Sequence, residues 1–190
     1  KADVKATICH TSTENLDIIP ANIDLSAAEV QLVNEVARES ALARVLRHVE
    51  SDYDVVLIDC QPSLGLLAVN ALTAAHGVIV PVEAEFFALR GVALLVETIE
   101  TVRDRINPRL KIDGIVATMV DSRTLHSREV LQRLQEAFGD LVFDTRIGRT
   151  IKFPDASVAT EPIISYAPNH AGAHAYRRLA REVIARGDAA

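Results

Sequence analysis

An aspartate at the end of a short apolar run is the first candidate for chemistry in this sequence. The run reads Tyr53-Asp54-Val55-Val56-Leu57-Ile58-Asp59-Cys60. Continuous apolarity with β-branched residues is typical of a strand that is covered on both faces. Open α/β sheets bind their ligands at the carboxyl ends of such strands. A buried carboxylate is costly unless it is paired or holds a metal ion, so we expect Asp59 to serve chemistry. The alternative is an aspartate that caps a loop or the next helix.

Basic residues form a second set of candidates. Arginine and lysine side chains neutralise phosphates without reading bases. From the residues alone, a solvated basic face is an equally good interpretation. The cations of interest are Arg123, Arg128, Arg146, Arg149 and Lys152.

Two further pairs have spacings that occur in metal sites. Glu83 and Glu85 flank Ala84 after a predicted strand, but we favour a solvated loop or helix start there, where negative charge is stabilised. His170 and His174 are one helical turn apart, as in zinc sites. No third ligand is nearby in the sequence, so we do not expect them to bind a metal.

Predicted strands and helices alternate along the chain, which is typical of parallel βαβ units with right-handed crossovers. We expect Ser26 and Ser63 to be helix N-caps, Asn107-Pro108 to end a long helix, and the whole chain to form one α/β domain. The predicted strands cover 16–19, 54–59, 78–82, 112–120, 142–145 and 163–164, and the predicted helices cover 26–49, 63–75, 86–106, a segment around 130–138, and 170–185.

Composition limits the possible functions. A chain of 190 residues with 49% hydrophobic residues can bury a substantial core. The net charge of −6 gives no overall attraction to nucleic acid, so any DNA contact must be local. Cys9 and Cys60 are too few for a disulfide framework, and we expect them to be buried in a protein of the reducing cytoplasm. No apolar run is long enough to cross a membrane.

Several segments resemble the ParA/Soj family of partitioning ATPases, in the MinD/ParA superfamily of P-loop NTPases with a deviant Walker motif. Residues 53–63 are similar to the family's Walker B segment, I-D-x-P-P-S, with Gln61 in place of a proline. The likeness continues through 64–72 and 80–91, and 15–21 resembles the strand before the family's variable helix. The larger departure is that no G-x-x-x-x-G-K-[ST] or K-G-G-x-G-K-[ST] occurs. The chain therefore looks like the later two-thirds of such a domain, without its first βαβ unit.

This resemblance implies a fold and a set of roles. The fold is a three-layer α/β domain with a mostly parallel sheet and helices on both faces. Asp59 would help to hold Mg²⁺ through a water molecule, and Met119, at a strand end, would contact the base of ATP. Asp121-Ser122-Arg123-Thr124 resembles the family's D-A-R-T, and Arg149-Thr150-Ile151-Lys152 resembles P-R-x-x-R with Gly148 before it. On this basis Arg123, Arg149 and Lys152 are the predicted DNA contacts.

The function implied is chromosome or plasmid segregation. ATP would drive homodimer formation, the dimer would bind DNA non-specifically at the nucleoid in the cytoplasm, and a ParB-like protein would stimulate hydrolysis. No membrane contact is expected, although the arginines of the last predicted helix invite comparison with MinD. Without a P-loop, these 190 residues alone should not hydrolyse ATP. The alternatives are a MinD-like or polarity ATPase and a non-catalytic binding module, and the mass of the natural protein would separate the last from the ATPases.

Overall fold

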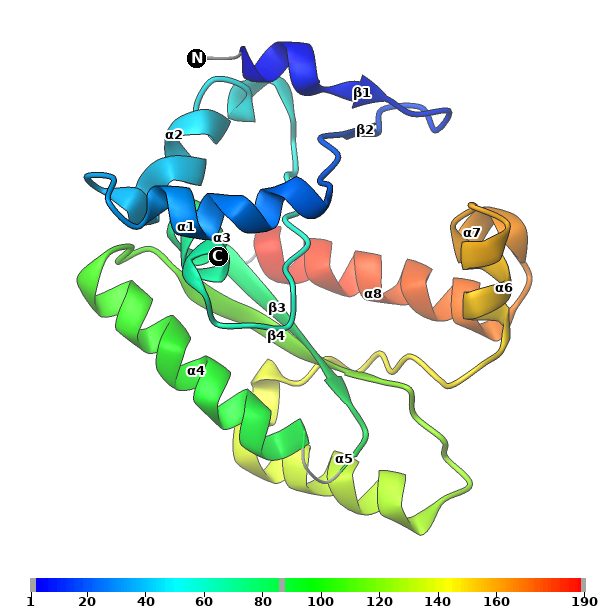
Figure 1. The fold of residues 1–190 in the computed structure, drawn as a ribbon. Coiled ribbons are helices and arrows are strands. Elements are labelled where there is room, and N and C mark those ends of the chain that lie inside the picture. Colours follow the sequence, from blue (N-terminus) through cyan, green and yellow to red (C-terminus); the bar gives the residue numbers. More distant parts are fainter. Residues whose placement is uncertain (1–2, 86–87, 189–190) are drawn as a thin grey trace. The chain divides into compact units, whose positions relative to one another are not determined.

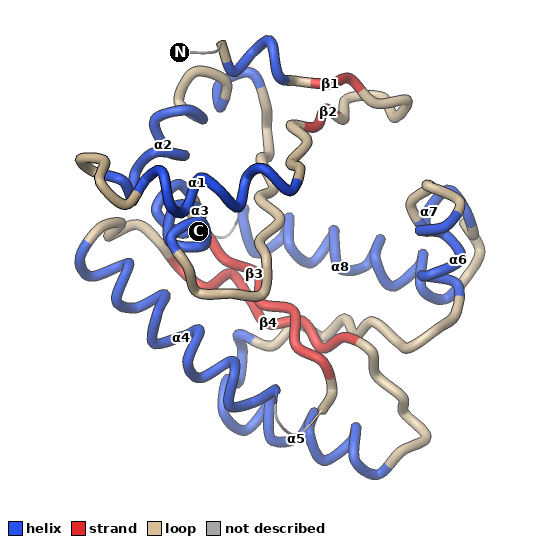
Figure 2. Tube along the Cα trace, viewed as in Figure 1, coloured by secondary structure: helices blue, strands red, loops and turns tan. Residues whose placement is uncertain are grey.

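The computed structural model describes residues 3–85 and 88–188, and it contains two compact units. The first comprises residues 1–76 and 98–110, and the second comprises residues 77–97 and 111–190. The helices and strands are labelled in Figure 1 and coloured by type in Figure 2. The first unit holds η1 (Val4–Thr7), β1 (Cys9–His10), β2 (Asp17–Ile18), η2 (Ile23–Ser26), α1 (Ala27–Leu32), η3 (Arg38–Ser40), α2 (Ala41–Leu46), η4 (Glu50–Asp52) and α3 (Leu66–Ala74). The second holds β3 (Gly77–Glu83), β4 (Lys111–Thr118), α5 (Leu125–Phe138), η5 (Gly139–Leu141), α6 (Lys152–Val158), α7 (Ile163–Tyr166) and α8 (Ala171–Asp188), while α4 (Ala88–Arg105) has residues in both.

The centre of the second unit is a pair of parallel strands. β3 pairs with β4 from Gly77 opposite Lys111 to Glu83 opposite Thr118. Parallel strands need a long crossover, and α4 supplies it here. Parallel bridges from Ile115 to Val142 and from Val120 to Gly148 continue the pairing beyond β4. The predicted parallel α/β arrangement is therefore confirmed, although the predicted strand at 142–145 is reduced to a single bridge.

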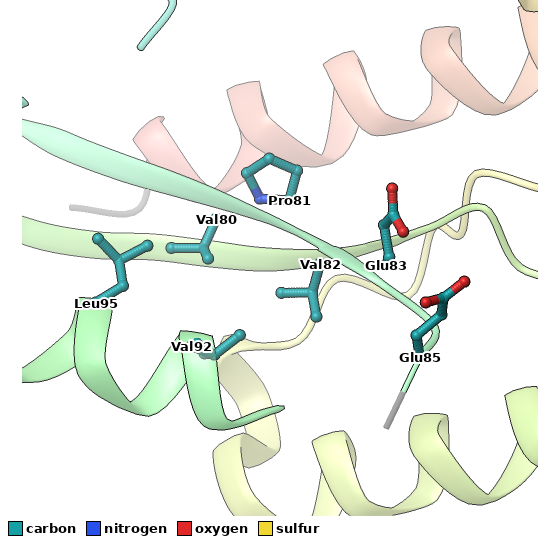
Figure 3. Close-up of a pocket in the computed structure, with 8 residues that line it drawn as sticks. Val80, Pro81, Val82, Glu83, Glu85, Val92 and Leu95 are labelled. Carbon is teal, nitrogen blue, oxygen red and sulfur yellow. The ribbon is translucent and has the colours of Figure 1, made fainter. Parts of the chain in front are cut away.

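Helices cover both faces of this strand pair. On one face Val116 packs with Phe143, Ile147 and Ala175, the last from α8. On the other face Val80 and Val82 point toward α4, where Figure 3 shows Val92 and Leu95 opposite them. Residues that alternate along a strand point to opposite faces, so the unbroken apolar run of β3 supplies both layers. This is the three-layer fold that the sequence predicts.

The strongly periodic helices form where the sequence predicts them, except that the predicted start of the long helix, at 86–87, lies outside the described residues. In α4, Ile99 and Val102 are buried on one face, and the helix ends at Arg105, just before Asn107-Pro108. In α5, Thr124 is the N-cap and its hydroxyl accepts a hydrogen bond from the N–H of Ser127. Gly139, with φ of 49°, follows the last turn in a conformation that glycine adopts readily.

The first unit is organised around Asn70 on α3. Its side chain is buried, and its amide oxygen accepts from the N–H of Leu42 at 3.1 Å. Its amide nitrogen donates to the carbonyls of Arg38 and Leu66 at 3.0 and 2.9 Å. One side chain thus satisfies backbone groups of three segments, which the apolar pattern of the sequence does not reveal.

Of the two predicted helix caps in this unit, Ser26 is the N-cap residue of α1 and Ser63 is not a cap. Ser26 makes no capping hydrogen bond from its side chain at the start of α1. Gly65, and not Ser63, is the N-cap of α3. The carboxylate of Glu29 lies at this helix start and accepts from the N–H of Leu67 at 3.3 Å, so a side chain distant in sequence supplies the acceptor that a local serine was expected to provide.

Three other predictions fail for local reasons. The predicted helix over 26–49 is broken, because Ala37 adopts the left-handed conformation with φ of 53° between α1 and η3. The predicted strand at 163–164 is the first turn of α7, with Pro162 at the N-cap. Cys9 and Cys60 are exposed rather than buried, because each lies in a segment that is not covered by a core layer.

Candidate functional site

Asp59 lies in an extended loop of the first unit, and the predicted strand over 54–59 is wrong. Val55 and Leu57 are 69% and 83% exposed. Among the described residues, no bridge or backbone hydrogen bond joins residues 54–60 to a neighbouring strand. An apolar run becomes a buried strand only when another strand pairs with its backbone and helices cover its faces. Within residues 3–85 and 88–188 nothing supplies that partner.

The oxygen ligands around Asp59 are few. Its carboxylate is exposed. No cluster of three or more His, Cys, Asp or Glu side chains that could hold a metal occurs in the described part of the chain. A single carboxylate fits Mg²⁺ only as part of a shell completed by water and phosphate oxygens, because Mg²⁺ gives up its water reluctantly.

A pocket of about 370 Å³ opens beside the carboxyl end of β3 in the second unit. Val80, Val82, Val92 and Leu95 form an apolar wall, and Figure 3 shows Glu83 and Glu85 beyond it at the end of the strand. Both glutamates are exposed, as the solvated interpretation requires. The N–H of Ala84 donates to the carbonyl of Thr118 at 3.1 Å, so the ends of β3 and β4 meet at one edge.

Met119 follows β4 at this same edge. Its φ of 52° lies in the left-handed region, which costs a non-glycine residue about 1 kcal/mol or more. Its side chain is 40% exposed, so it is not a core residue. An exposed, flexible thioether held on a strained turn at the carboxyl end of a strand is well placed to contact a ligand, and contact with a base remains a prediction.

Asp121 and Arg123 form a two-pronged ion pair just beyond Met119. The guanidinium donates from Nε and Nη2 to the two carboxylate oxygens at 2.9 and 2.8 Å, and the N–H of Arg123 donates to the same carboxylate at 3.1 Å. These bonds, helped by the charge of Arg149, lower the pKa of Asp121 to about 2. The N–H of Arg149 donates to the carbonyl of Val120 at 3.0 Å, which brings the two predicted DNA-contact segments together.

Lys152 is also paired with an acid of its own segment. Its ammonium group donates to Asp155 at 3.0 Å within the first turn of α6, and it lies 5.9 Å from the ring centroid of Tyr166. Arg149 is exposed, and no ion pair of its guanidinium occurs among the described residues. Met119, Arg123, Arg149 and Lys152 all belong to the second unit, whereas Asp59 belongs to the first.

One histidine of the predicted pair makes a hydrogen bond to the backbone. Nδ1 of His170 accepts a hydrogen bond from the N–H of Gly172 at 3.0 Å, at the start of α8.

The arginines of α8 have different surroundings. Arg177 donates to the carbonyls of Pro168 and Ile164, whereas Arg178 is exposed. In the described part of the chain no helix is both long and apolar enough to cross a membrane.

Comparison with known proteins decides the family. A family model described as an AAA domain matches residues 1–112. An uncharacterised protein of Mycobacterium tuberculosis is 59% identical over 98% of this chain and 58% of its own length. The chromosome-partitioning ATPase Soj of Treponema pallidum is 45% identical over 98% of this chain and 74% of its own length. The chain belongs to the ParA/Soj family of partitioning ATPases.

A solved structure supports the fold assignment of this ParA/Soj chain. The structure named cobyrinic acid a,c-diamide synthase from Mycobacterium smegmatis, with a bound ATP analogue and magnesium, has a TM-score of 0.79 and 41% identity, and the match covers 93% of this chain and 65% of that one. The chain spans only 58% of the length of the M. tuberculosis relative.

The pairing of Asp121 with Arg123 was not predicted from the sequence. An aspartate two residues before an arginine is nevertheless a spacing that permits such a pair.

Proposed function

We propose that this chain is part of an ATP-hydrolysing partitioning protein that moves a chromosome or plasmid. The observation that carries the proposal is the 45% identity with Soj over 98% of the chain. The proposal is supported by the similarity of residues 53–63 to a Walker B segment and by the ATP analogue and magnesium in a 41% identical structure. Residues 1–190 would then form one domain, corresponding to the later two-thirds of a ParA-type ATPase domain.

In this proposal Asp59 holds Mg²⁺ through a water molecule, and Met119 contacts the base of ATP. The metal supplies positive charge that stabilises the phosphates of the nucleotide. The 190 residues contain no phosphate-binding loop sequence, and consecutive backbone N–H donors are what such loops give to phosphates. These residues alone should therefore bind ATP weakly and not turn it over.

The DNA contact in this proposal is local and needs two copies of the chain. A net charge of −6 opposes binding overall, so a few cations must act together. An ATP-bound homodimer would double the set formed by Arg123, Arg149 and Lys152 and raise the combined affinity. A ParB-like partner would stimulate hydrolysis and so release the dimer from the nucleoid DNA. The alternatives are a MinD-like or polarity ATPase and a non-catalytic binding module.

ATP turnover by the complete natural protein tests the catalytic part. Asp59→Ala should lower the rate at least about 100-fold, because the metal's charge is lost from the site. Asp54→Ala is the matched control, since Asp54 is an exposed carboxylate of the same loop, and it should keep turnover within about 3-fold of wild type. Wild-type turnover by the Asp59 variant would remove Asp59 from the mechanism.

The name of the M. smegmatis structure supplies a second candidate function, the formation of a diamide from cobyrinic acid. Turnover that depends on cobyrinic acid and is unaffected by DNA and by a ParB-like protein would favour it over partitioning. Turnover that rises with DNA and a ParB-like protein, and ignores cobyrinic acid, would favour the partitioning proposal.

A further inference from the structure

Two of the three cations expected to contact DNA are already occupied by carboxylates of the same chain. Arg123 is held by Asp121 through the N–H donors of Nε and Nη2, and Lys152 is held by Asp155. Both pairs are short-range in sequence, at separations of two and three residues. Local pairs of this kind form as soon as the turn or helix forms, and they do not depend on the rest of the fold.

The Asp121 carboxylate binds the Arg123 guanidinium in the way that an anionic ligand would. It accepts three hydrogen bonds from Arg123, counting the backbone N–H, and it also feels the charge of Arg149. A phosphate presents the same kind of charged oxygen acceptors to a guanidinium and favours the same forked geometry. A DNA phosphate that approached Arg123 from the Nε and Nη2 side would therefore compete with Asp121 for these two donors.

We propose that Asp121 is an intramolecular competitor of DNA, which keeps Arg123 occupied and limits the affinity of the dimer for the phosphate backbone. This inference rests on the proposed DNA-binding function and adds its regulation. The Arg123 side chain is 88% exposed, so the pair is accessible to solvent and can exchange. The exchange replaces one ion pair by another, and DNA contact at this position gives only a small net gain. Asp155 acts on Lys152 in the same way.

The consequence is a DNA contact that is weak for each subunit and easily reversed by salt. Binding would become appreciable only when the contacts of two subunits add, since the effect of each phosphate contact multiplies the others. A protein that must leave DNA when its nucleotide is hydrolysed benefits from a limited affinity for DNA. If both Arg123 and Arg149 were permanently free, they would hold the monomer on DNA as well.

The test measures binding of a random-sequence DNA duplex by the complete natural protein with saturating ATP and Mg²⁺, over a range of salt concentrations. Asp121→Asn keeps the shape of the side chain and removes its charge. We expect it to tighten binding about 3- to 10-fold at low salt and to steepen the plot of log affinity against log salt by about one for each arginine released. Asp155→Asn should give a smaller gain, because Lys152 also lies by Tyr166.

The matched control is Asp140→Asn, which removes one negative charge at an exposed position of the same unit, in η5. It should change DNA affinity less than about 2-fold, and this separates the local effect from the change in net charge. Combining Arg123→Ala with Asp121→Asn should remove most of the gain. ATP affinity is measured for each variant, so that the comparison is made at equal saturation.

The outcomes separate the inference from the proposed function. If Asp121→Asn binds DNA no more tightly than Asp140→Asn, or more weakly than wild type, the competition is wrong and Asp121 instead positions Arg123, while wild-type DNA binding still supports the function. If neither wild type nor Asp121→Asn binds DNA with ATP present, both proposals fail. Binding by the Asp121 variant that exceeds that of wild type, and that depends on Arg123, establishes the competition.

Discussion

The guanidinium of Arg186 stacks on the ring of Phe143, with its central carbon 4.0 Å from the ring centroid. The same guanidinium donates to the carbonyls of Asp113, Leu141 and Val142 at 3.0 to 3.1 Å. One side chain near the end of α8 therefore joins this helix to β4, to η5 and to the residue after η5. A Cβ atom at Gly114 would collide with the ring of Phe143, so this glycine leaves the space in which the ring lies.

Arg186→Ala should destabilise the second unit. The change removes three charge-assisted hydrogen bonds and the contact with the ring, and it leaves carbonyls without a partner, which together cost about 2–4 kcal/mol. Chemical denaturation followed by circular dichroism measures the loss. Arg178→Ala is the matched control, because Arg178 is exposed on the same helix, and it should change the free energy of unfolding by less than about 0.5 kcal/mol. Equal stability of the two variants would refute the role of Arg186.

Asn70→Ala should destabilise the first unit through unsatisfied backbone groups. The N–H of Leu42 and the carbonyl of Arg38 would lose their partner in a buried place, at a cost of about 2–4 kcal/mol. Asn34→Ala removes the same kind of side chain from an exposed turn and should be nearly neutral. The measurement is the denaturation midpoint of the two variants. Similar midpoints would show that water replaces the amide of Asn70 at little cost.

The pair of Asp121 and Arg123 should contribute to stability in a defined pH range. Because the folded-state pKa of Asp121 is lowered from 3.8 to about 2, the unfolded chain binds the proton more readily. The stabilising contribution is therefore complete above a pH of about 4 and is lost as the pH falls through about 2. The difference in denaturation midpoint between wild type and Asp121→Asn should stay constant from about pH 8 to 5 and shrink below about 4. A difference that persists at the acid end would contradict the assignment.

Arg149 should matter more for DNA than Lys152, because Arg149 is exposed and makes no ion pair with the described residues, whereas Lys152 must leave Asp155. In the complete protein with ATP, Arg149→Ala should weaken DNA binding about 3- to 10-fold. It should also reduce the slope of log affinity against log salt by about one for each arginine removed. Lys152→Ala should weaken DNA binding about 2-fold. Lys111→Ala, at the amino end of β4, serves as the control. A larger loss for Lys152 than for Arg149 would reverse this order.

The sequence predicted the elements whose signal is long and periodic. The apolar stripe of α4 with Ile99 and Val102, the stripe of α5 with Val130 and Leu134, and the run of β3 around Val80 all lie where a single stretch of chain determines the structure. Segments that need a partner elsewhere were predicted less well. The run from Val55 to Ile58 has the composition of a buried strand, but composition does not supply the neighbouring strand that would pair with it.

Polar contacts between distant segments could not be predicted from the sequence. Glu29 lies at the start of α3 and Asn70 reaches the backbone of Leu42, and no local spacing indicates either contact. The pairing of Asp121 with Arg123 is local, yet the residues alone do not tell whether an arginine faces its own aspartate or a ligand. Family resemblance named Arg123 as a DNA contact, and the geometry adds the carboxylate that competes for it.

DNA binding by the complete natural protein, measured with and without ATP and Mg²⁺ in one salt titration, is the decisive experiment. We expect little binding without nucleotide and sequence-independent binding with ATP, which weakens steeply as salt rises because several phosphate contacts of two subunits are lost together. Arg149→Ala in the same titration should give a flatter slope. Tight binding that does not depend on ATP, or no binding with ATP at low salt, would contradict the partitioning proposal and favour a MinD-like ATPase or a non-catalytic module.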